Sequence, residues 1–547
     1  MTDRGGTGSG VRSTLRLALS RPGMRRALIA YGLFATTEMA TWIALLVWAF
    51  DRGGASAAGT IAVVQLLPAM VAAPLVAALL ERLPRRQALH LGYLLQTAAN
   101  VAAGVALLAG SPFWLVAAVA AVAASTMTLT RPVHHALMPE LARTPEELTA
   151  SNAASTAVDG IGVFLGPALA GALLVVGSAG SVFLVMAAVG LVAVLLIGPS
   201  AGDRRPRPET ARASYWTDMA QGLRVALRDP AARALTTIVS AQYVVVGMLD
   251  ILAVVLALDI LRTGPAGPGI LGAAVGIGGL VGAGTAIALL RTEHMGLGLL
   301  LAMIVAAIPV ALVAGVPGLA IACALFGLSG AGLAGVDVAA RTLLQRSVPP
   351  TVLARILGIQ EAMLMGGTAV GAALAPLLVT LLGPRAAFLA VAGVLPLSAA
   401  LVTRQIRRLD AAGPPSQDVE LLRANSTFAA LPPAQLEQLA SALIHPAPLA
   451  DGSVLFRQGD EGDRCYLVVE GAMRIERDGV LLATLGPGDI VGEIALLRDI
   501  PRTATARAQG EVQLAALERA PFMLALTGSE QAAADITART RRRLDEQ

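Results

Sequence analysis

The chain has 547 residues, of which 55% are hydrophobic and 14% are charged, and its mean hydropathy is +0.69. This composition is too apolar for a soluble protein of several domains, so most of the chain is expected to face lipid. The formal net charge is only +4 and all 41 basic residues are arginine, a pattern that gives no indication of nucleic-acid binding.

Apolar segments long enough to cross a bilayer recur through roughly the first 400 residues and then stop, and each span needs about 20 residues to cross about 30 Å of hydrocarbon. We predict twelve membrane-spanning helices. They lie near residues 27–50, 57–80, 87–109, 113–137, 150–176, 179–199, 234–260, 267–290, 296–314, 317–343, 352–382 and 384–403.

Arginine is distributed unevenly between the predicted loops. With a cytoplasmic N-terminus, the outer loops keep only Arg52, Arg262 and Arg385. Because basic loops stay on the cytoplasmic side, we predict a multi-pass protein of the cell membrane with both termini in the cytoplasm. Residues 1–26 are polar and lack a small-residue cleavage site, so no cleaved signal peptide is expected.

The apolar region repeats at an offset of 205 residues, so that Gly162 and Gly166 recur as Gly367 and Gly371. Two six-span halves are the layout of a rocking transporter whose substrate cavity lies between them near the midplane. The predicted domains are an N-terminal tail (1–26), a first half (27–199), a cytoplasmic central loop (200–233), a second half (234–403), a linker (404–417) and a soluble domain (418–547).

The loop after the second predicted span resembles the loop signature of the major facilitator superfamily. It reads Ala77-Ala78-Leu79-Leu80-Glu81-Arg82-Leu83-Pro84-Arg85-Arg86. Ala77 and Pro84 replace the glycines of that signature, and the charges remain. The resemblance implies that the charged side chains latch the cytoplasmic gate. These are Glu81, Arg82, Arg85 and Arg86.

The fifth predicted span carries Gly162, Gly166, Pro167 and Gly171, a spacing that resembles the signature of drug and proton antiporters in the same superfamily. The resemblance implies efflux. Close packing of helices through small residues is the alternative interpretation. The segment 136–141 resembles the siderophore and macrolide exporter branch.

Acidic residues inside the spans are candidates for coupling transport to protons, because a charge at the bilayer centre costs at least about 2.5 to 3.5 kcal/mol. Glu38, near the middle of the first span, is the preferred proton site, and Asp250 in the seventh span is its counterpart in the second half. Asp159 and Asp337 are further candidates. For Asp337 the alternative is an ion pair with Arg341, four residues later.

After residue 411 the pattern changes to that of a small antiparallel β-roll bracketed by helices. Residues 418–443 have helical periodicity, and 454–456, 466–469 and 473–476 are strand candidates. Asp478-Gly479 predicts a two-residue hairpin turn. The predicted fold class is therefore a multi-pass α-helical membrane protein with a C-terminal α+β domain.

Residues 486–497 and 501–505 resemble the phosphate-binding cassette of cyclic-nucleotide-binding domains, as in catabolite activator protein and the regulatory subunit of cAMP-dependent kinase. Arg502 can hold two phosphate oxygens, and Glu493 can accept a hydrogen bond from the ribose 2′-hydroxyl. Thr503 does not decide between cAMP and cGMP. The residues that the resemblance assigns to the nucleotide are Val491, Gly492, Glu493, Ile494, Ala495, Arg502 and Thr503.

Transcription factors with this domain continue into a helix-turn-helix of about 60 residues, but only 528–547 follow here, so we expect no DNA binding. Residues 532–544 are expected to form a lid helix. Cys323 and Cys465 have no metal-site or disulfide spacing, and no catalytic motif, metal site or cofactor is expected.

These observations predict a proton-coupled secondary transporter, not an enzyme, that exports a small amphipathic molecule and is regulated by a cyclic nucleotide, with cAMP favoured over cGMP. One alternative is a membrane-anchored cyclic-nucleotide receptor without transport. Another is a lipid or lysolipid flippase with the same fold. The expected partners are a small-molecule substrate, the nucleotide and the lipid bilayer, and the sequence does not specify an oligomeric state.

Overall fold

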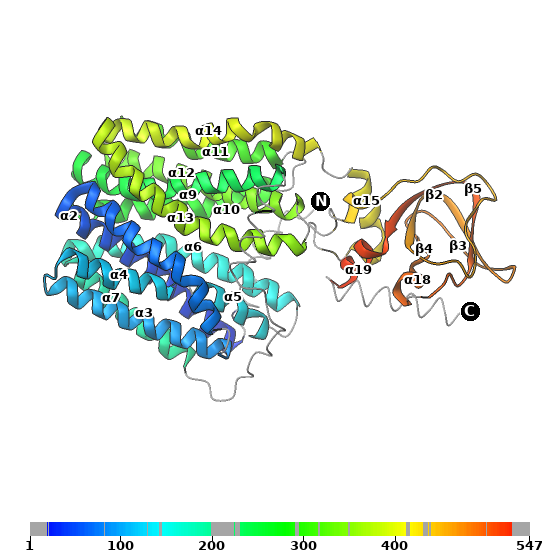
Figure 1. Ribbon diagram of the computed structural model, residues 1–547, viewed down its shortest axis with the longest axis horizontal. Helices are drawn as coiled ribbons and strands as arrows, with labels where there is room; N and C mark the ends of the chain where they lie inside the picture. The colour runs from blue at the N-terminus through cyan, green and yellow to red at the C-terminus, as the bar shows by residue number, and fades with distance from the viewer. Residues whose placement is uncertain are drawn as a thin grey trace, which may run out of the picture. The chain divides into compact units, whose positions relative to one another are not determined.

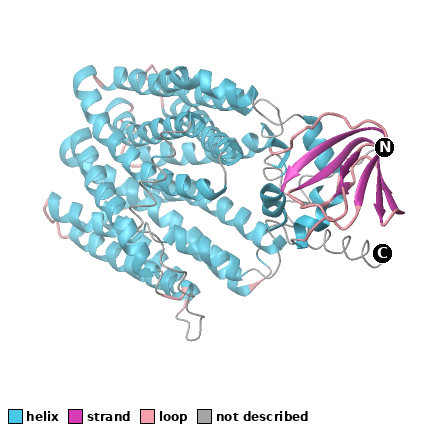
Figure 2. Cartoon of the chain, turned by 45° about the vertical axis from the view of Figure 1, so that its right-hand side comes forward, coloured by secondary structure: helices cyan, strands magenta, loops and turns pink. Residues whose placement is uncertain are grey.

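A computed structural model of the protein separates into two compact units, residues 1–410 and 411–547, which are described one at a time (Figure 1). The structure describes residues 19, 21–80, 83–127, 130–141, 145–198, 224, 230–289, 295–315, 318–347, 350–411, 416–429, 431, 436, 439–498 and 500–527. The first unit is helical and the second is built on a β-sheet, as the sequence predicts (Figure 2).

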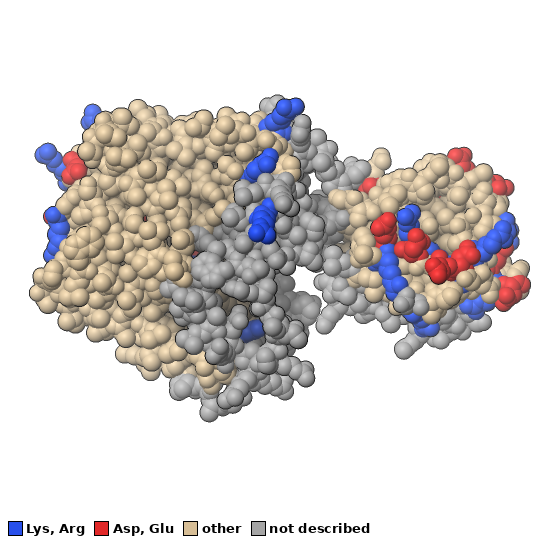
Figure 3. Space-filling view, in the orientation of Figure 1, with Lys and Arg blue, Asp and Glu red and all other residues tan. Residues whose placement is uncertain are grey.

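The first unit consists of long helices in two groups. The first group is α2 (Pro22–Leu80), α3 (Arg85–Leu108), α4 (Phe113–Met127), α5 (Thr130–Leu141), α6 (Pro145–Val176) and α7 (Ala179–Ile197). The second is α9 (Pro230–Val255), its π-helical continuation η1 (Leu256–Ile260), α10 (Gly267–Leu289), α11 (Met295–Val313), α12 (Leu319–Ser347), α13 (Pro350–Leu382) and α14 (Pro384–Ala411). The surface of this unit in Figure 3 carries few charged side chains along the helices.

Eleven helices among the described residues are long and apolar enough to cross a membrane. The first of them, α2, has 59 residues and is interrupted by non-helical backbone at Gly53 and Gly54. Gly54 has a φ of +60°, which glycine adopts without the steric cost of a Cβ. Division of α2 at this bend gives the arrangement of the first two predicted spans, and the total of twelve remains a prediction.

The predicted ends of several spans differ from the observed ones. Helix α14 continues to Ala411, so the first eight residues of the predicted linker 404–417 are helical. No glycine or proline interrupts the chain between Leu397 and Ala411, and the helix therefore continues past the apolar segment. The central loop 200–233 and the C-terminal residues 528–547, including the predicted lid helix, fall outside the described ranges apart from 224 and 230–233.

Small residues set the packing of both halves in the same way. Gly162 and Gly166 of α6 lie against α2, where a Cβ at Gly166 would be 2.5 Å from Met39 Cβ and 2.7 Å from the Thr36 carbonyl oxygen. Gly367 and Gly371, their repeats in α13, lie against α9. The repeat in the sequence thus corresponds to the same close helix contact in each half.

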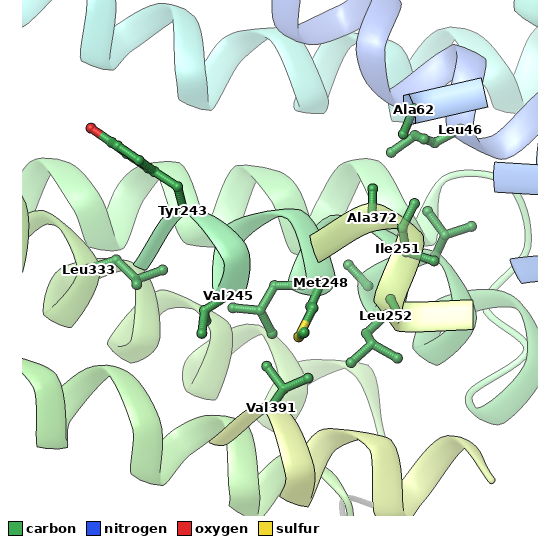
Figure 4. Close-up of a cluster of buried hydrophobic side chains, with 14 of the residues drawn as sticks. Leu46, Ala62, Tyr243, Val245, Met248, Ile251, Leu252, Leu333, Ala372 and Val391 are labelled. Atoms are coloured by element: carbon green, nitrogen blue, oxygen red, sulfur yellow. The ribbon is translucent and has the colours of Figure 1, made fainter. Parts of the chain in front are cut away.

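The halves share a hydrophobic core at the end of the bundle that carries the Gly53–Gly54 bend. Figure 4 shows Leu46 and Ala62 of α2 beside Ile251 of α9 and Ala372 of α13, all of them buried. A Cβ at Gly59, five residues after the bend, would be 2.6 Å from the Ala372 carbonyl oxygen. Tight backbone packing between the halves therefore closes this end.

The second unit is a five-stranded antiparallel sheet with short helices. Its strands are β1 (Val454–Phe456), β2 (Arg464–Arg477), β3 (Val480–Leu485), β4 (Ile490–Val491) and β5 (Thr505–Glu518), in the order β1-β5-β2-β3 with β4 paired to β2. Its helices include α15 (Ser416–Ala424), α16 (Ser426–Ala429), α18 (Glu493–Arg498) and α19 (Arg519–Thr527). The segment 418–443, which has helical periodicity, is not one continuous helix. Asn425 separates α15, which ends at Ala424, from α16, which begins at Ser426.

Two predicted features of the sheet have particular geometry. The strand candidates 466–469 and 473–476 form one strand, β2, whose pairing with β5 is irregular around Gly471, a residue with a φ of +86°. Asp478 and Gly479 have φ values of +52° and +82°, and positive values at both positions are those of a type I′ hairpin turn between β2 and β3. The hairpin prediction is confirmed.

The close contact at Gly166 yields a stability prediction. Replacing Gly166 by Val should lower the free energy of unfolding by about 1 to 3 kcal/mol, because the added atoms meet the α2 backbone. Thermal unfolding of the detergent-solubilised protein measures this. The matched control is Gly393→Val in α14, where a Cβ has nothing within 4 Å. Equal unfolding midpoints for the two variants would contradict the packing argument.

Candidate functional site

A cavity of about 950 Å³ lies in the first unit, lined by residues of both six-helix halves. Helix α2 contributes Tyr31, Glu38 and Trp42, and helix α9 contributes Tyr243 and Asp250. The cavity is in the size range of ligand sites in proteins. All four acidic residues predicted for coupling line it, namely Glu38, Asp159, Asp250 and Asp337.

Arg131 of α5 joins two of these acids. Its Nη2 lies 2.6 Å from Glu38 Oε2 and its Nη1 lies 2.6 Å from Asp159 Oδ1. The Tyr31 hydroxyl donates to Asp159 Oδ1 at 3.2 Å. One guanidinium therefore connects carboxylates from α2 and α6, and each of these three charged groups has a partner of opposite charge.

The sequence pattern did not identify Arg131 as the partner of Glu38 and Asp159. Arginine in a predicted span is itself a signal, because an intramembrane charge needs a partner. The sequence does not say which acid that partner is. Three helices separated by up to 128 residues must pack before the cluster exists.

Tyr31 and Glu38 recur at an offset of 212 residues as Tyr243 and Asp250, but the second half pairs its charges differently. Asp250 Oδ2 accepts a hydrogen bond of 3.2 Å from Trp42 Nε1, across the two halves. Arg341 Nε instead lies 3.1 Å from Asp337 Oδ2 on its own helix. The pair of Asp337 and Arg341 has the geometry that their spacing predicts, and it also lines the cavity.

The predicted gate residues are only partly described, because Glu81 and Arg82 fall outside the described ranges. Arg85 Nη1 donates to the Ala136 carbonyl oxygen of α5. Arg86 donates to the Ile197 carbonyl oxygen at the end of α7, from Nη2 at 2.8 Å. Both arginines thus bind carbonyl groups within the first half, and Arg86 caps the end of α7. Their gating role remains a prediction.

The antiporter-like residues of α6 lie where helices approach most closely. Gly162 and Gly166 contact α2, and Gly171 lies against Gly269 of α10, where an added Cβ would be 3.3 Å from the Gly269 Cα. Pro167 is inside α6 and also lines the cavity. This placement fits the helix-packing interpretation and puts the segment at the boundary of the two halves.

The second unit has a pocket of about 100 Å³ beside helix α18. Strands β2 and β3 supply its apolar wall with Ile475, Leu482 and Leu485. All seven residues that the sequence assigned to the nucleotide line this pocket, namely Val491, Gly492, Glu493, Ile494, Ala495, Arg502 and Thr503. The fold therefore brings the two segments of the predicted cassette to one wall.

Arg502 is the central charge of the pocket and only 4% of it is exposed. Its Nη1 donates to the Gly492 carbonyl oxygen at 2.9 Å and its Nη2 to the Arg464 carbonyl oxygen at 2.7 Å. The guanidinium carbon lies 4.2 Å from the centre of the Phe456 ring. Burial lowers the pKa of Arg502 from its usual value. The acceptors are neutral carbonyls, so the charge can still pair with an anion.

Gly492 and Glu493 complete the wall around Arg502. Gly492 has a φ of +84°, and a side chain there would collide with the Arg502 guanidinium. Glu493 begins α18 and is 5% exposed. Burial of a charged group is costly unless the group has a partner. The arginine of this pocket fits the phosphate of a cyclic nucleotide, and the carboxylate fits the ribose hydroxyl.

Comparison with known proteins agrees with both units. Residues 27–334 and 290–459 match the Major Facilitator Superfamily, and residues 447–540 match the Cyclic nucleotide-binding domain. Neither is an enzyme family. The chain is 29% identical over 396 residues to an uncharacterized MFS-type transporter of Sinorhizobium fredii, covering 70% of this chain and 95% of the relative.

Two further likenesses concern one unit each. Over 92 residues the chain is 41% identical to the cAMP-dependent protein kinase regulatory subunit of Dictyostelium discoideum, covering 15% of this chain and 28% of that protein. It thus spans less than a third of the length of this relative. The crystal structure of the nucleoside transporter NupG shares the fold, with a TM-score of 0.60 at 10% identity over 70% of this chain and 99% of the other.

The pocket region also yields a chemical prediction for Cys465 of β2, which is fully buried. Burial, with a smaller contribution from the charge of Glu493, raises the pKa of the Cys465 thiol well above its usual value. Because the thiolate is the nucleophile, iodoacetamide at about pH 8 should leave Cys465 unmodified in the folded protein and alkylate it fully after unfolding. Mass spectrometry of the Cys323→Ser variant measures this. Full alkylation of the folded protein would contradict the burial.

Proposed function

The chain belongs to the Major Facilitator Superfamily and carries a C-terminal cyclic nucleotide-binding domain, and from this premise we propose that it is a proton-coupled exporter of a small amphipathic molecule, regulated by cAMP. Proton coupling is supported above all by one observation, the pairing of Arg131 with Glu38 and Asp159 at the wall of the central cavity.

The charge cluster supplies a group that can change its protonation state during transport. In the ion-paired arrangement, Arg131 faces two carboxylates, so the cluster has a formal charge of −1. Protonation of Glu38 would remove one of the two and leave a neutral pair with Asp159. Because an uncompensated charge is costly within the bilayer, the two protonation states favour different helix positions. Glu38 is the proposed proton carrier, and Asp159 holds Arg131 in place.

Closure of the bundle at the Gly53–Gly54 bend corresponds to the conformation in which the proposed exporter would take up its substrate. In the predicted topology this bend faces the outside, so the packed end is the outer one and the cavity is accessible from the cytoplasm. A substrate that enters from the cytoplasm would be released after the two halves rock. The cell membrane and the cytoplasmic termini remain part of the proposal.

Proton coupling predicts that Glu38→Gln abolishes gradient-driven transport. In proteoliposomes with an imposed pH gradient, the flux of fluorescent amphipathic dyes such as ethidium should show no stimulation by the gradient, because the glutamine amide cannot carry a proton. Dye exchange without a gradient should persist. The matched control is Asp51→Asn, an exposed carboxylate at the bend.

Two outcomes would overturn this part of the proposal. Full gradient-driven flux in Glu38→Gln would exclude Glu38 as the carrier. Absence of dye transport by the wild type, with cyclic-nucleotide binding retained, would favour a membrane-anchored receptor instead. Lipid scrambling that survives Glu38→Gln would favour the flippase alternative.

Regulation by cAMP is supported by the buried Arg502 and Glu493 at one pocket and by the likeness of residues in this domain to a cAMP-dependent kinase regulatory subunit. The two units are joined through α14, which ends at Ala411, and α15, which begins at Ser416. Only four residues separate these helices. A ligand of the second unit can bias transport only if its affinity differs between the states of the first.

The binding prediction is micromolar affinity for cAMP, tighter than for cGMP, that is lost in Arg502→Ala. Loss of a charged hydrogen-bond partner costs about 1.5 to 3 kcal/mol, which weakens binding about 10- to 100-fold. Calorimetry on the full-length protein in detergent measures it. Arg507→Ala is the control, because this exposed arginine of β5 binds the Gly452 carbonyl oxygen away from the pocket. Tighter binding of cGMP would overturn the nucleotide assignment.

A further inference from the structure

The central cavity is acidic. Its described lining residues include four carboxylates, Glu38, Asp159, Asp250 and Asp337, and two guanidinium groups, Arg131 and Arg341, so its formal net charge is −2. The arginines are already engaged, since Arg131 pairs with Glu38 and Asp159, and Arg341 pairs with Asp337. Asp250 carries a further negative charge, and neither arginine pairs with it.

Asp250 differs from the other three acids in its partner. Its Oδ2 accepts one hydrogen bond, from Trp42 Nε1 at 3.2 Å, and within the described part of the chain no basic side chain forms an ion pair with it. Asp250 faces the cavity from α9 and Trp42 faces it from α2. A carboxylate can accept several hydrogen bonds, so most of the acceptor capacity of Asp250 is open toward the cavity.

A second acceptor lies at the same depth. Gln65 is 8% exposed, lines the cavity, and its Oε1 has no hydrogen-bond partner. Trp42 lies eleven residues before Gly53, and Gln65 lies eleven residues after Gly54, so both are about 16 Å along the helix from the bend. Trp42, Gln65 and Asp250 therefore form one level of the cavity, and a buried acceptor without a donor is costly.

Gln242 repeats this pattern at a level of the cavity that is farther from the Gly53–Gly54 bend. Its Nε2 donates to the Leu333 carbonyl oxygen at 3.1 Å, which fixes the orientation of the amide, and its Oε1 has no partner. Gln242 is 5% exposed and lies two helical turns from Asp250 on α9. Gln242 therefore presents an acceptor without a partner, and the amide of Gln65, which makes no hydrogen bond to the described residues through either atom, can turn its oxygen toward a donor of the ligand.

Much of the remaining wall is apolar and polarisable. It includes Met39, Met127, Phe326 and Met365, together with the rings of Tyr31 and Tyr243. Such a surface favours an aliphatic or aromatic body, and aromatic faces also attract cations. The cavity thus combines a place for a positive donor group with a place for an apolar body.

We infer that the transported molecule is an amphipathic amine bound as its ammonium ion, with Asp250 as the counter-ion and Gln65 Oε1 as a second acceptor. This inference rests on the proposed transport function and specifies its substrate class. A primary ammonium group has three N–H donors and one positive charge, which matches one carboxylate and one amide oxygen. Glu38 remains the proton carrier, one helical turn from Trp42, so substrate and proton use different carboxylates.

Binding of a fluorescent primary amine to the full-length protein in detergent tests the inference. The probe is dansylcadaverine, and its neutral N-acetyl and permanently charged N-trimethyl derivatives are the comparisons. The wild type should bind the amine at least about tenfold more tightly than the N-acetyl derivative, and Asp250→Asn should weaken amine binding by at least about tenfold, because each removes one partner of a desolvated charge pair.

Matched variants separate charge recognition from misfolding. Asp250→Glu, which keeps the carboxylate, should retain amine binding within a few-fold. Asp259→Asn removes an exposed carboxylate of η1 outside the cavity and should not change the dissociation constant. Gln65→Met should weaken binding of the primary amine and leave that of the N-trimethyl derivative unchanged, because the quaternary ammonium group has no N–H to donate.

Equal affinity for the amine and its N-acetyl derivative, or an unchanged dissociation constant in Asp250→Asn, would overturn the inference. The readout is independent of transport, since binding is measured at equilibrium without a gradient. Amine binding that depends on Asp250 in a protein without proton-driven flux would refute the proposed function alone. Proton-driven flux of dyes with no charge discrimination at Asp250 would refute the substrate class alone.

Discussion

The ion pairs of Arg131 are the constraint around which the first unit is organised. A guanidinium in an apolar bundle must find counter-charges, and Arg131 finds them on α2 and α6, 2.6 Å away in each case. These contacts hold three helices of the first half around the cavity. They also place a titratable carboxylate, Glu38, at the cavity wall, so the interaction that stabilises the half is the one that protonation can change.

The two halves share a packing scheme and differ in electrostatics. Glycines of α6 and α13 approach α2 and α9 in the same manner, which is the structural meaning of the internal repeat. The charges do not follow the repeat, because Asp337 gives Arg341 a partner on its own helix and Asp250 is left with Trp42. One half therefore carries a charge network between helices, and the other presents an acid to the cavity.

In the second unit a buried arginine is held by backbone groups instead of carboxylates. Arg502 is almost fully buried, and carbonyl oxygens of Gly492 and Arg464 hold it in place. Neutral acceptors orient a guanidinium without neutralising it, so the pocket keeps a positive charge for an anionic ligand. The positive φ of Gly492 allows this close approach, since a side chain at that position would occupy the space of the guanidinium.

The sequence by itself determined the membrane character, the two-half repeat and the β-roll with its Asp478-Gly479 turn, because these depend on local periodicity, spacing and turn chemistry. The seven residues of the predicted cassette came from a family resemblance, and they line one pocket of the second unit. The sequence did not determine the continuous β2 strand, the extension of α14 to Ala411 or the partners of Glu38, Asp159 and Asp250. Only the tertiary structure decided which side chains pair with Glu38, Asp159 and Asp250. An ion pair or hydrogen bond in an apolar bundle forms between whichever side chains the helix packing brings within reach, and these partners are 28 to 208 positions apart, so no local pattern records them.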